Sequence, residues 1–194
     1  MGPQARFITG LISFLLLLPS LVWANDIKIL KQEAVATTQT FVKQLGSAMQ
    51  KEMKAGGPMA AAKVCSELAP QITSQISRDK GWKVTRVGAR VRNPMLGIAD
   101  RGEQEVLKKF QERKSKGESF EKMAYAEIVD EPNGKYFRFM KAIGVKGQCL
   151  ACHGGSTAIK QEVKDMLAKN YPHDKAKGYK VGDLRGAVSI KRPL

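Results

Sequence analysis

The chain has 194 residues and a net charge of +15 at neutral pH, from 33 Lys and Arg against 18 Asp and Glu. This length suits one domain with its own core, and the sequence contains no internal repeat, no long linker and no recognisable nucleic-acid-binding module. The basic residues are spread along the chain, which is typical of a solvated surface, with docking to an acidic partner or attraction to anionic lipid as alternatives.

Residues 1–24 have the composition of a secretory signal peptide. Arg6 precedes an apolar run that ends in small residues at Ala24, before Asn25. The run is shorter than the ~20 residues that span a bilayer, and Pro19 interrupts it. We therefore expect cleavage after Ala24 rather than retention as an anchor, and no membrane span in the domain that follows, residues 25–194.

Two helices are expected next. Apolar residues recur at helical spacing over 27–53, and Gly56-Gly57 should end that helix. Pro58 suits the first turn of a second helix, which places Cys65 on its apolar face. Pro70 cannot donate a hydrogen bond to the carbonyl of residue 66, so a kink is expected one turn past Cys65.

The rest of the chain mixes strands with helices. Residues 82–91 alternate like a strand that ends before Pro94, and Asp100 with Glu103 predicts a capping box for a helix. Two further strands are joined by a hairpin turn at Asn133-Gly134. A helix over 156–170 and a strand over 184–192 follow. This order predicts an α+β domain around an antiparallel sheet.

The stretch QCLACHGG carries the main chemical signal, with Cys149 and Cys152 two residues apart and His153 directly after. A zinc site would need four ligands, and no second paired motif exists. A thioredoxin-type dithiol should begin a helix, which Gly154-Gly155 disfavours. Covalent attachment of haem fits best, because two cysteines at this spacing followed by histidine form the c-type attachment motif. His153 would then be an axial iron ligand, and the predicted signal peptide supplies the export to the bacterial periplasm that attachment requires.

The other iron ligand is less certain from the residues. With Cys149 and Cys152 used as thioethers, Cys65 has no disulfide partner in the chain, and an oxidising compartment disfavours a free thiol unless it is buried or metal-bound. Cys65 is the favoured sixth ligand on this argument. His173, a methionine such as Met123 or Met140, and an open position remain alternatives.

The ordered set VCSELAP, RVRNP, YFRFMKAI, CLACHGG and YPHDKAKGYKVGDLRGAVSI resembles a family of exported c-type haem proteins with a PAS-like domain, long catalogued as a domain of unknown function. The resemblance covers most of the chain after the leader. It implies a PAS-like α+β fold and iron held by the motif histidine, here His153, and by a cysteine of an N-terminal helix, here Cys65. The chain departs from the family pattern at Met95-Leu96-Gly97 and at Ala142.

A bound haem would need further contacts besides its iron ligands. Its propionates need cationic or hydrogen-bonding partners, for which the candidates are Arg86, Arg90, Arg92 and Lys141. The aromatic rings that could pack on it are Tyr136, Tyr171 and Tyr179. Gly154-Gly155 is expected to let the backbone turn close to the porphyrin.

Ligation at both axial positions argues against an enzyme, because substrate could reach the iron only by displacing a ligand. A thiolate favours ferric iron, so reduction should weaken the iron–sulfur bond and open a position for a diatomic gas. The first hypothesis is therefore a redox or gas sensor that signals through a partner protein. The alternative is a small electron-transfer cytochrome.

Overall fold

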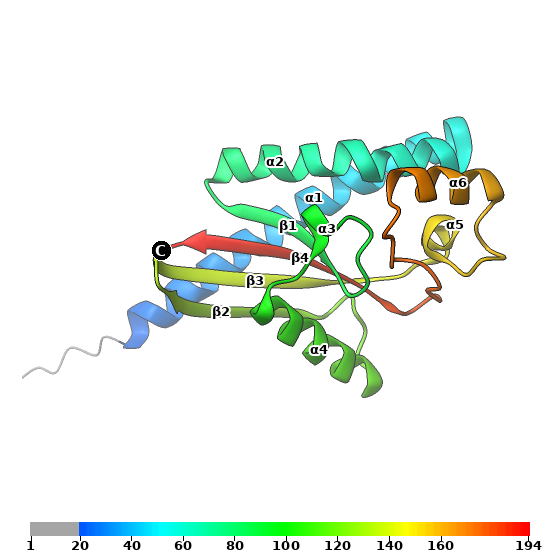
Figure 1. Cartoon of the computed structure of the whole chain (residues 1–194). Helices are drawn as coiled ribbons and strands as arrows, with labels where there is room; N and C mark the ends of the chain where they lie inside the picture. The colour runs from blue at the N-terminus through cyan, green and yellow to red at the C-terminus, as the bar shows by residue number, and fades with distance from the viewer. Residues whose placement is uncertain (1–19) are drawn as a thin grey trace, which may run out of the picture.

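A four-stranded antiparallel sheet in the order β1-β4-β3-β2 forms the centre of the molecule (Figure 1). The computed structural model describes residues 20–194, with side chains from residue 26, so most of the predicted signal peptide (1–24) lies outside the described residues. The α+β class expected from the sequence is confirmed. The strands are β1 (Lys83–Gly88), β2 (Ala124–Glu131), β3 (Gly134–Gly144) and β4 (Leu184–Pro193).

The β2–β3 hairpin turns where the sequence predicted. Glu131 pairs with Gly134 at its end, and Gly134 has a positive φ of 136°, which favours glycine. β4 then inserts between β1 and β3, antiparallel to both. The last strand is therefore a central strand.

Helices α1 (Ser20–Lys63) and α2 (Ala69–Lys80) cover one face of the sheet (Figure 1). Alternate residues of β3, Phe137 and Phe139, point to this face because side chains of a strand alternate between the two sides. They pack with Leu30 and Phe41 of α1 and with Ile190 of β4 in one buried cluster.

Helix α4 (Arg101–Ser115) covers the opposite face. Its predicted capping box is present: the Asp100 carboxylate accepts from Glu103 N–H, and the Glu103 carboxylate accepts from Asp100 N–H. Phe110 packs there against Met123 and Met140, both buried. The two methionines therefore belong to the sheet core, which the alternating pattern favoured.

The expected break between two N-terminal helices occurs at Gly57, whose φ of 66° and ψ of −158° interrupt the helical path of α1. The two arms on either side of Gly57 form a helical hairpin. Past it, the kink expected near Pro70 takes the form of a π-helix, η1 (Val64–Leu68), in which Ala69 N–H donates to Val64 carbonyl. Cys65 lies inside η1 rather than one turn before the irregularity.

Helices α5 (Leu150–His153) and α6 (Gln161–Asn170) lie together at one end of the sheet (Figure 1), and η2 (Gly147–Cys149) leads directly into α5. Helix α3 (Pro94–Gly97) lies instead against β1. The helix predicted over 156–170 is shorter at its start, because Ile159 is buried in the preceding turn and Lys160 has an extended backbone.

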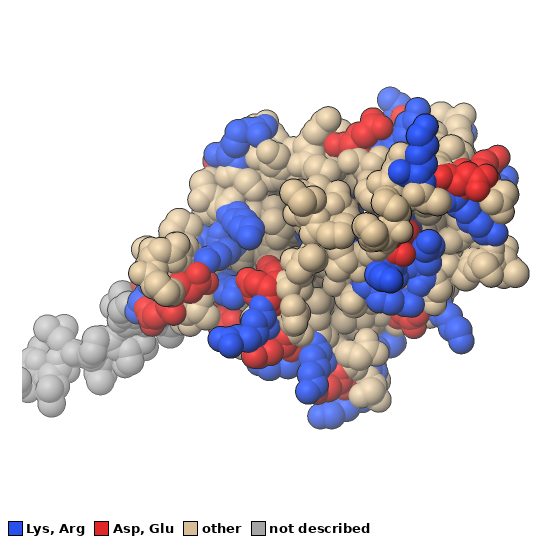
Figure 2. All heavy atoms as spheres, viewed as in Figure 1, with Lys and Arg blue, Asp and Glu red and all other residues tan. Residues whose placement is uncertain are grey.

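The surface carries its positive charge in dispersed groups. Figure 2 shows Lys and Arg in several separate places around the visible face, with Asp and Glu among them. In the part of the chain that the structure describes, no helix combines the length and the apolar character that crossing a bilayer requires.

Candidate functional site

The attachment motif forms a compact double turn between β3 and α6. η2 ends at Cys149, and α5 carries Cys152 and His153 before Gly154 ends the helix with an extended backbone. Gly154 is buried, and a Cβ there would lie 2.6 Å from the Leu150 carbonyl oxygen. Glycine is needed at this position because the chain folds back on itself. Gly155 is exposed with open space around it, so only the first of the two glycines is sterically required.

The segment 174–179 holds His153 in place. Two backbone hydrogen bonds join this segment to the end of α5: Gly178 N–H donates to the Gly154 carbonyl, and Tyr179 N–H donates to the His153 carbonyl. The His153 Nδ1 lies 2.7 Å from the Ala176 carbonyl oxygen, which can only accept. Nδ1 therefore carries the proton, and the lone pair of Nε2 is left for a metal, the usual arrangement of a histidine ligand.

The charge state of His153 suits that role. Burial, followed by the positive charges of Arg185 and Arg92, lowers the pKa of His153 to about 3. The imidazole is therefore neutral at physiological pH, as metal ligation requires.

An ion pair ties this segment to the motif. Arg92 Nε donates to the Asp174 carboxylate at 3.0 Å, and the Asp174 side chain has no exposed surface. The other oxygen of Asp174 accepts from Ala176 N–H, and Arg92 donates to the Cys152 carbonyl at 2.5 Å. Arg92 is thus a structural clamp on the motif rather than a free cation.

Cys65 reaches the same region from the helical hairpin. Its thiol lies close enough to Cys152 to contribute to the raised pKa of that thiol, which burial raises most and Arg92 opposes. Its Sγ lies 3.8 Å from the Sδ of Met49 on the other arm. Cys65 therefore lies in the neighbourhood of Cys152, although the two residues are far apart in the sequence.

A group of arginines surrounds these residues. Burial lowers the pKa of Arg86, and the nearby Cys65 thiol opposes that shift. Arg185 adds positive charge beside His153, and Arg90 stacks on the Tyr179 ring at 3.7 Å. Among the described residues, Arg86, Arg90 and Arg185 form no ion pair with a carboxylate. The site thus has cationic groups available for an anionic ligand.

Sequence reasoning named Arg86, Arg90 and Arg92 but missed Arg185. Arg185 lies in β4, within a segment that gave only a strand signal. Its position next to the site follows from the antiparallel pairing of β4 with β1, where Arg86 pairs with Val188. The position of Arg185 beside the site therefore follows from the strand order and not from a local sequence motif.

Other residues singled out from the sequence have different environments. Lys141 donates to the Glu121 carbonyl, and Tyr136 lies under the Lys191 ammonium near the opposite end of β3. His173 is exposed. Tyr171 and Tyr179 do lie at the site: Tyr171 packs in a cluster with Cys152, and the Tyr179 ring lies edge-on to His153 with ring centroids 6.2 Å apart.

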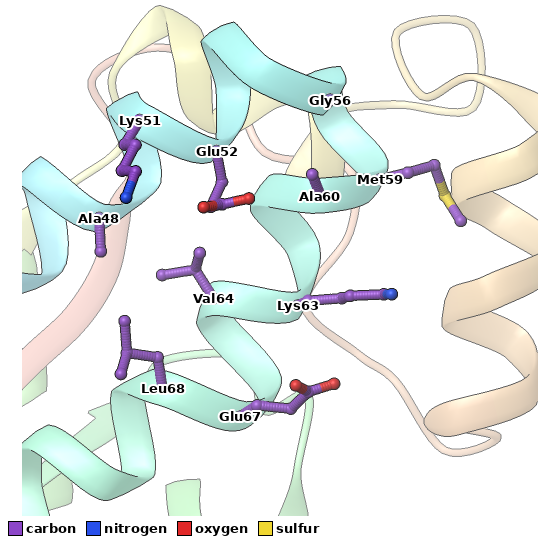
Figure 3. Close-up of a pocket in the computed structure, with 10 residues that line it drawn as sticks. All are labelled: Ala48, Lys51, Glu52, Gly56, Met59, Ala60, Lys63, Val64, Glu67 and Leu68. Atoms are coloured by element: carbon purple, nitrogen blue, oxygen red, sulfur yellow. The ribbon is translucent and has the colours of Figure 1, made fainter.

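A separate groove of about 690 Å³ opens between the two arms of the helical hairpin (Figure 3). Val64 and Leu68 of η1 form part of its wall, and Lys51 and Glu52 face them from the first arm. Cys65 does not line it. In the described part of the chain, no three His, Cys, Asp or Glu side chains gather as a metal site.

Family comparison gives these features a context. The model of the Tll0287-like family matches residues 25–193, and the chain therefore belongs to this family. Among solved structures, the chain is similar to the crystal structure of the cyanobacterial heme-protein Tll0287, with 25% sequence identity and a TM-score of 0.63. The match covers 84% of this chain and 96% of that chain. No curated protein matches.

Proposed function

We propose that this protein binds one haem covalently through Cys149 and Cys152, with His153 and Cys65 as the axial iron ligands. The solved relative is a haem protein, which supports the cofactor. The observation that carries the proposal is the hydrogen bond from His153 Nδ1 to the Ala176 carbonyl, because it leaves Nε2 ready to bind a metal next to two cysteines at the attachment spacing.

The residues present fit such a group. The two cysteines are partly buried and pack against apolar clusters, Cys149 against the one that contains Val145 and Cys152 against the one that contains Val163. The guanidinium groups of Arg86 and Arg185, which form no ion pair with a carboxylate among the described residues, can neutralise the two propionates. Haem would supply the redox and gas-binding chemistry, while the chain sets which atoms reach the iron.

Ligation by the Cys65 thiolate points to sensing. A thiolate would stabilise ferric iron, and protonation of Cys65 on reduction would leave a coordination position for a diatomic gas. Cys65 lies in the π-helical segment η1, and π-bulges occur often at functional sites. A change at Cys65 would therefore be transmitted to the helical hairpin and to a partner protein. Such a module is not an enzyme, since both axial positions are filled at rest.

We also propose where the protein is located, what kind of partner it binds and what role its sheet has. The chain is exported to the periplasm with cleavage near Ala24, its basic surface docks an acidic partner, and its sheet serves as a PAS-like sensing scaffold. The dispersed positive charge supports docking of an acidic partner through solvated contacts.

Electron transfer is the second candidate, favoured by the arginines around the motif, which could guide an acidic redox partner. The two functions differ in what reduction does. A sensor loses the Cys65 ligand on reduction and binds NO or CO, whereas an electron carrier keeps its ligands and excludes both gases.

The decisive experiment compares the exported protein with Cys65→Ser and His153→Ala. A haem stain on a denaturing gel tests covalent attachment, and Cys149→Ala with Cys152→Ala should abolish it. Electron paramagnetic resonance of the ferric protein tests ligation. A low-spin thiolate signal that is lost in Cys65→Ser supports the proposal, and an identical ferric spectrum in that variant contradicts it.

A further inference from the structure

We propose that Met49 is a second sulfur ligand, which replaces Cys65 at the iron when the haem is reduced. This inference rests on the proposed function. It is motivated by the contact between the Cys65 Sγ and the Met49 Sδ, 3.8 Å apart although the residues lie 16 positions from each other. The two arms of the helical hairpin thus present a thiol and a thioether to the same place.

Met49 is not accounted for by core packing. Met123 and Met140 are buried in the cluster under α4, and Met59 and Met166 pack in the cluster of α6. Among the described residues, Met49 belongs to none of the four hydrophobic clusters, and it is only partly buried. Its sulfur accepts a contact from the Cys65 thiol at 3.8 Å.

The two sulfurs suit opposite oxidation states. A thiolate is anionic and favours ferric iron, whereas a neutral thioether raises the potential and so favours ferrous iron. In the exchange, a one-electron donor reduces the iron, the bond to Cys65 breaks, and its thiolate takes one proton from solvent. The Met49 thioether donates its lone pair into the vacated position. The exchange therefore takes up one electron and one proton and releases no group.

The surrounding helices permit the exchange. The π-turn η1 contains one residue more per turn than an α-helix, so its relaxation would move Cys65 along the helix. Met49 has three rotatable bonds and an adaptable thioether, so a small change of rotamer can carry its sulfur across a few ångströms. The first arm of the hairpin need not unfold.

The test uses the haem-loaded variant Met49→Leu, in which the side-chain volume at position 49 changes little. The ferric resonance spectrum should match the wild type, because Cys65 is unchanged. The ferrous absorption spectrum should change from six-coordinate low-spin to five-coordinate high-spin. The apparent CO affinity should rise about tenfold or more, since an internal competitor that occupied most of the iron is gone. Met95→Leu, a control at an exposed methionine of α3, should leave both spectra unchanged.

A second measurement avoids substitution. In wild-type protein labelled with selenomethionine, X-ray absorption at the selenium edge should detect iron as a selenium neighbour in the ferrous state and not in the ferric state. Absence of that neighbour in the ferrous state, or an unchanged ferrous spectrum in Met49→Leu, overturns the role of Met49. Failure of the proposed function is separate, since it is detected by an unchanged ferric spectrum in Cys65→Ser.

Discussion

The guanidinium of Arg92 and the carboxylate of Asp174 lie 3.0 Å apart, although 82 positions separate them in the chain. This pair links the end of β1 to the segment that supports His153. Asp174 also accepts from Ala176 N–H, and the carbonyl of Ala176 in turn bonds the His153 ring. The geometry of the proposed iron ligand thus depends on a residue that never touches it.

Removing one partner of this pair should be costly. Asp174→Ala leaves the Arg92 charge buried without a counter-ion, and we expect a loss of about 3 kcal/mol in the free energy of unfolding. Urea denaturation followed by circular dichroism measures this. The matched control is Glu121→Ala, which removes the exposed pair with Lys146 and should cost less than about 1 kcal/mol. Equal losses in the two variants would contradict a buried clamp.

The two glycines after His153 should respond differently to alanine. A Cβ at position 154 would lie 2.6 Å from the Leu150 carbonyl oxygen and 2.9 Å from the Ala158 Cβ, so Gly154→Ala must shift the motif. We expect about 2 kcal/mol of destabilisation, typical of overpacking, and weaker haem incorporation. Gly155→Ala meets nothing within 4 Å and should behave like the wild type in thermal melts and haem stain. Similar behaviour of both variants would exclude the steric role of Gly154.

Acid should weaken the start of α4. Burial alone would raise the pKa of Asp100, but the hydrogen bond from Glu103 N–H and the ion pair with Arg138 lower it below its ordinary value of 3.8. A carboxyl group with a depressed folded pKa stabilises above the unfolded pKa, and this contribution is lost as the pH falls through the folded value. Asp100→Ala should cost about 1 kcal/mol at pH 7 and flatten the loss of stability below pH 4. Denaturant midpoints between pH 7 and pH 2 report the difference; parallel curves for both proteins would refute it.

Positive charge beside His153 should tune the potential of the proposed haem. Arg185→Gln removes a cation near the proposed iron ligand, and less positive charge favours the ferric state. We expect a lower midpoint potential, because the free energy of reducing the iron becomes less favourable by on the order of 1 kcal/mol. Spectroelectrochemical titration measures this. The control Arg101→Gln, at an exposed position on α4, should leave the potential unchanged.

The sequence predicted most of the elements because local signals and tertiary packing agree. Asp100 and Glu103 cap α4, Gly57 interrupts α1, and Asn133-Gly134 closes the β2–β3 hairpin. The irregularity near Pro70 was expected, but its π-helical form was not, because it depends on how the backbone absorbs one missing donor.

The site was predictable only in part. Cys149, Cys152 and His153 form a contiguous motif that is visible in the sequence, whereas the role of Cys65 as an iron ligand stays a prediction. Arg185, Met49 and Asp174 were missed, since their positions depend on strand order and on the hairpin of helices. Lys141 was a candidate partner of the haem propionates because its segment could reach them, yet its ammonium donates to the Glu121 carbonyl.

The central position of β4 has a consequence for biogenesis. β4 follows every other described element along the chain, yet both β1 and β3 hydrogen-bond to it. A polypeptide that emerges from its amino end first therefore displays the motif at 149–153 before the sheet can close. Under the haem attachment proposed above, that interval would give a maturation enzyme access to both thiols before folding partly buries them.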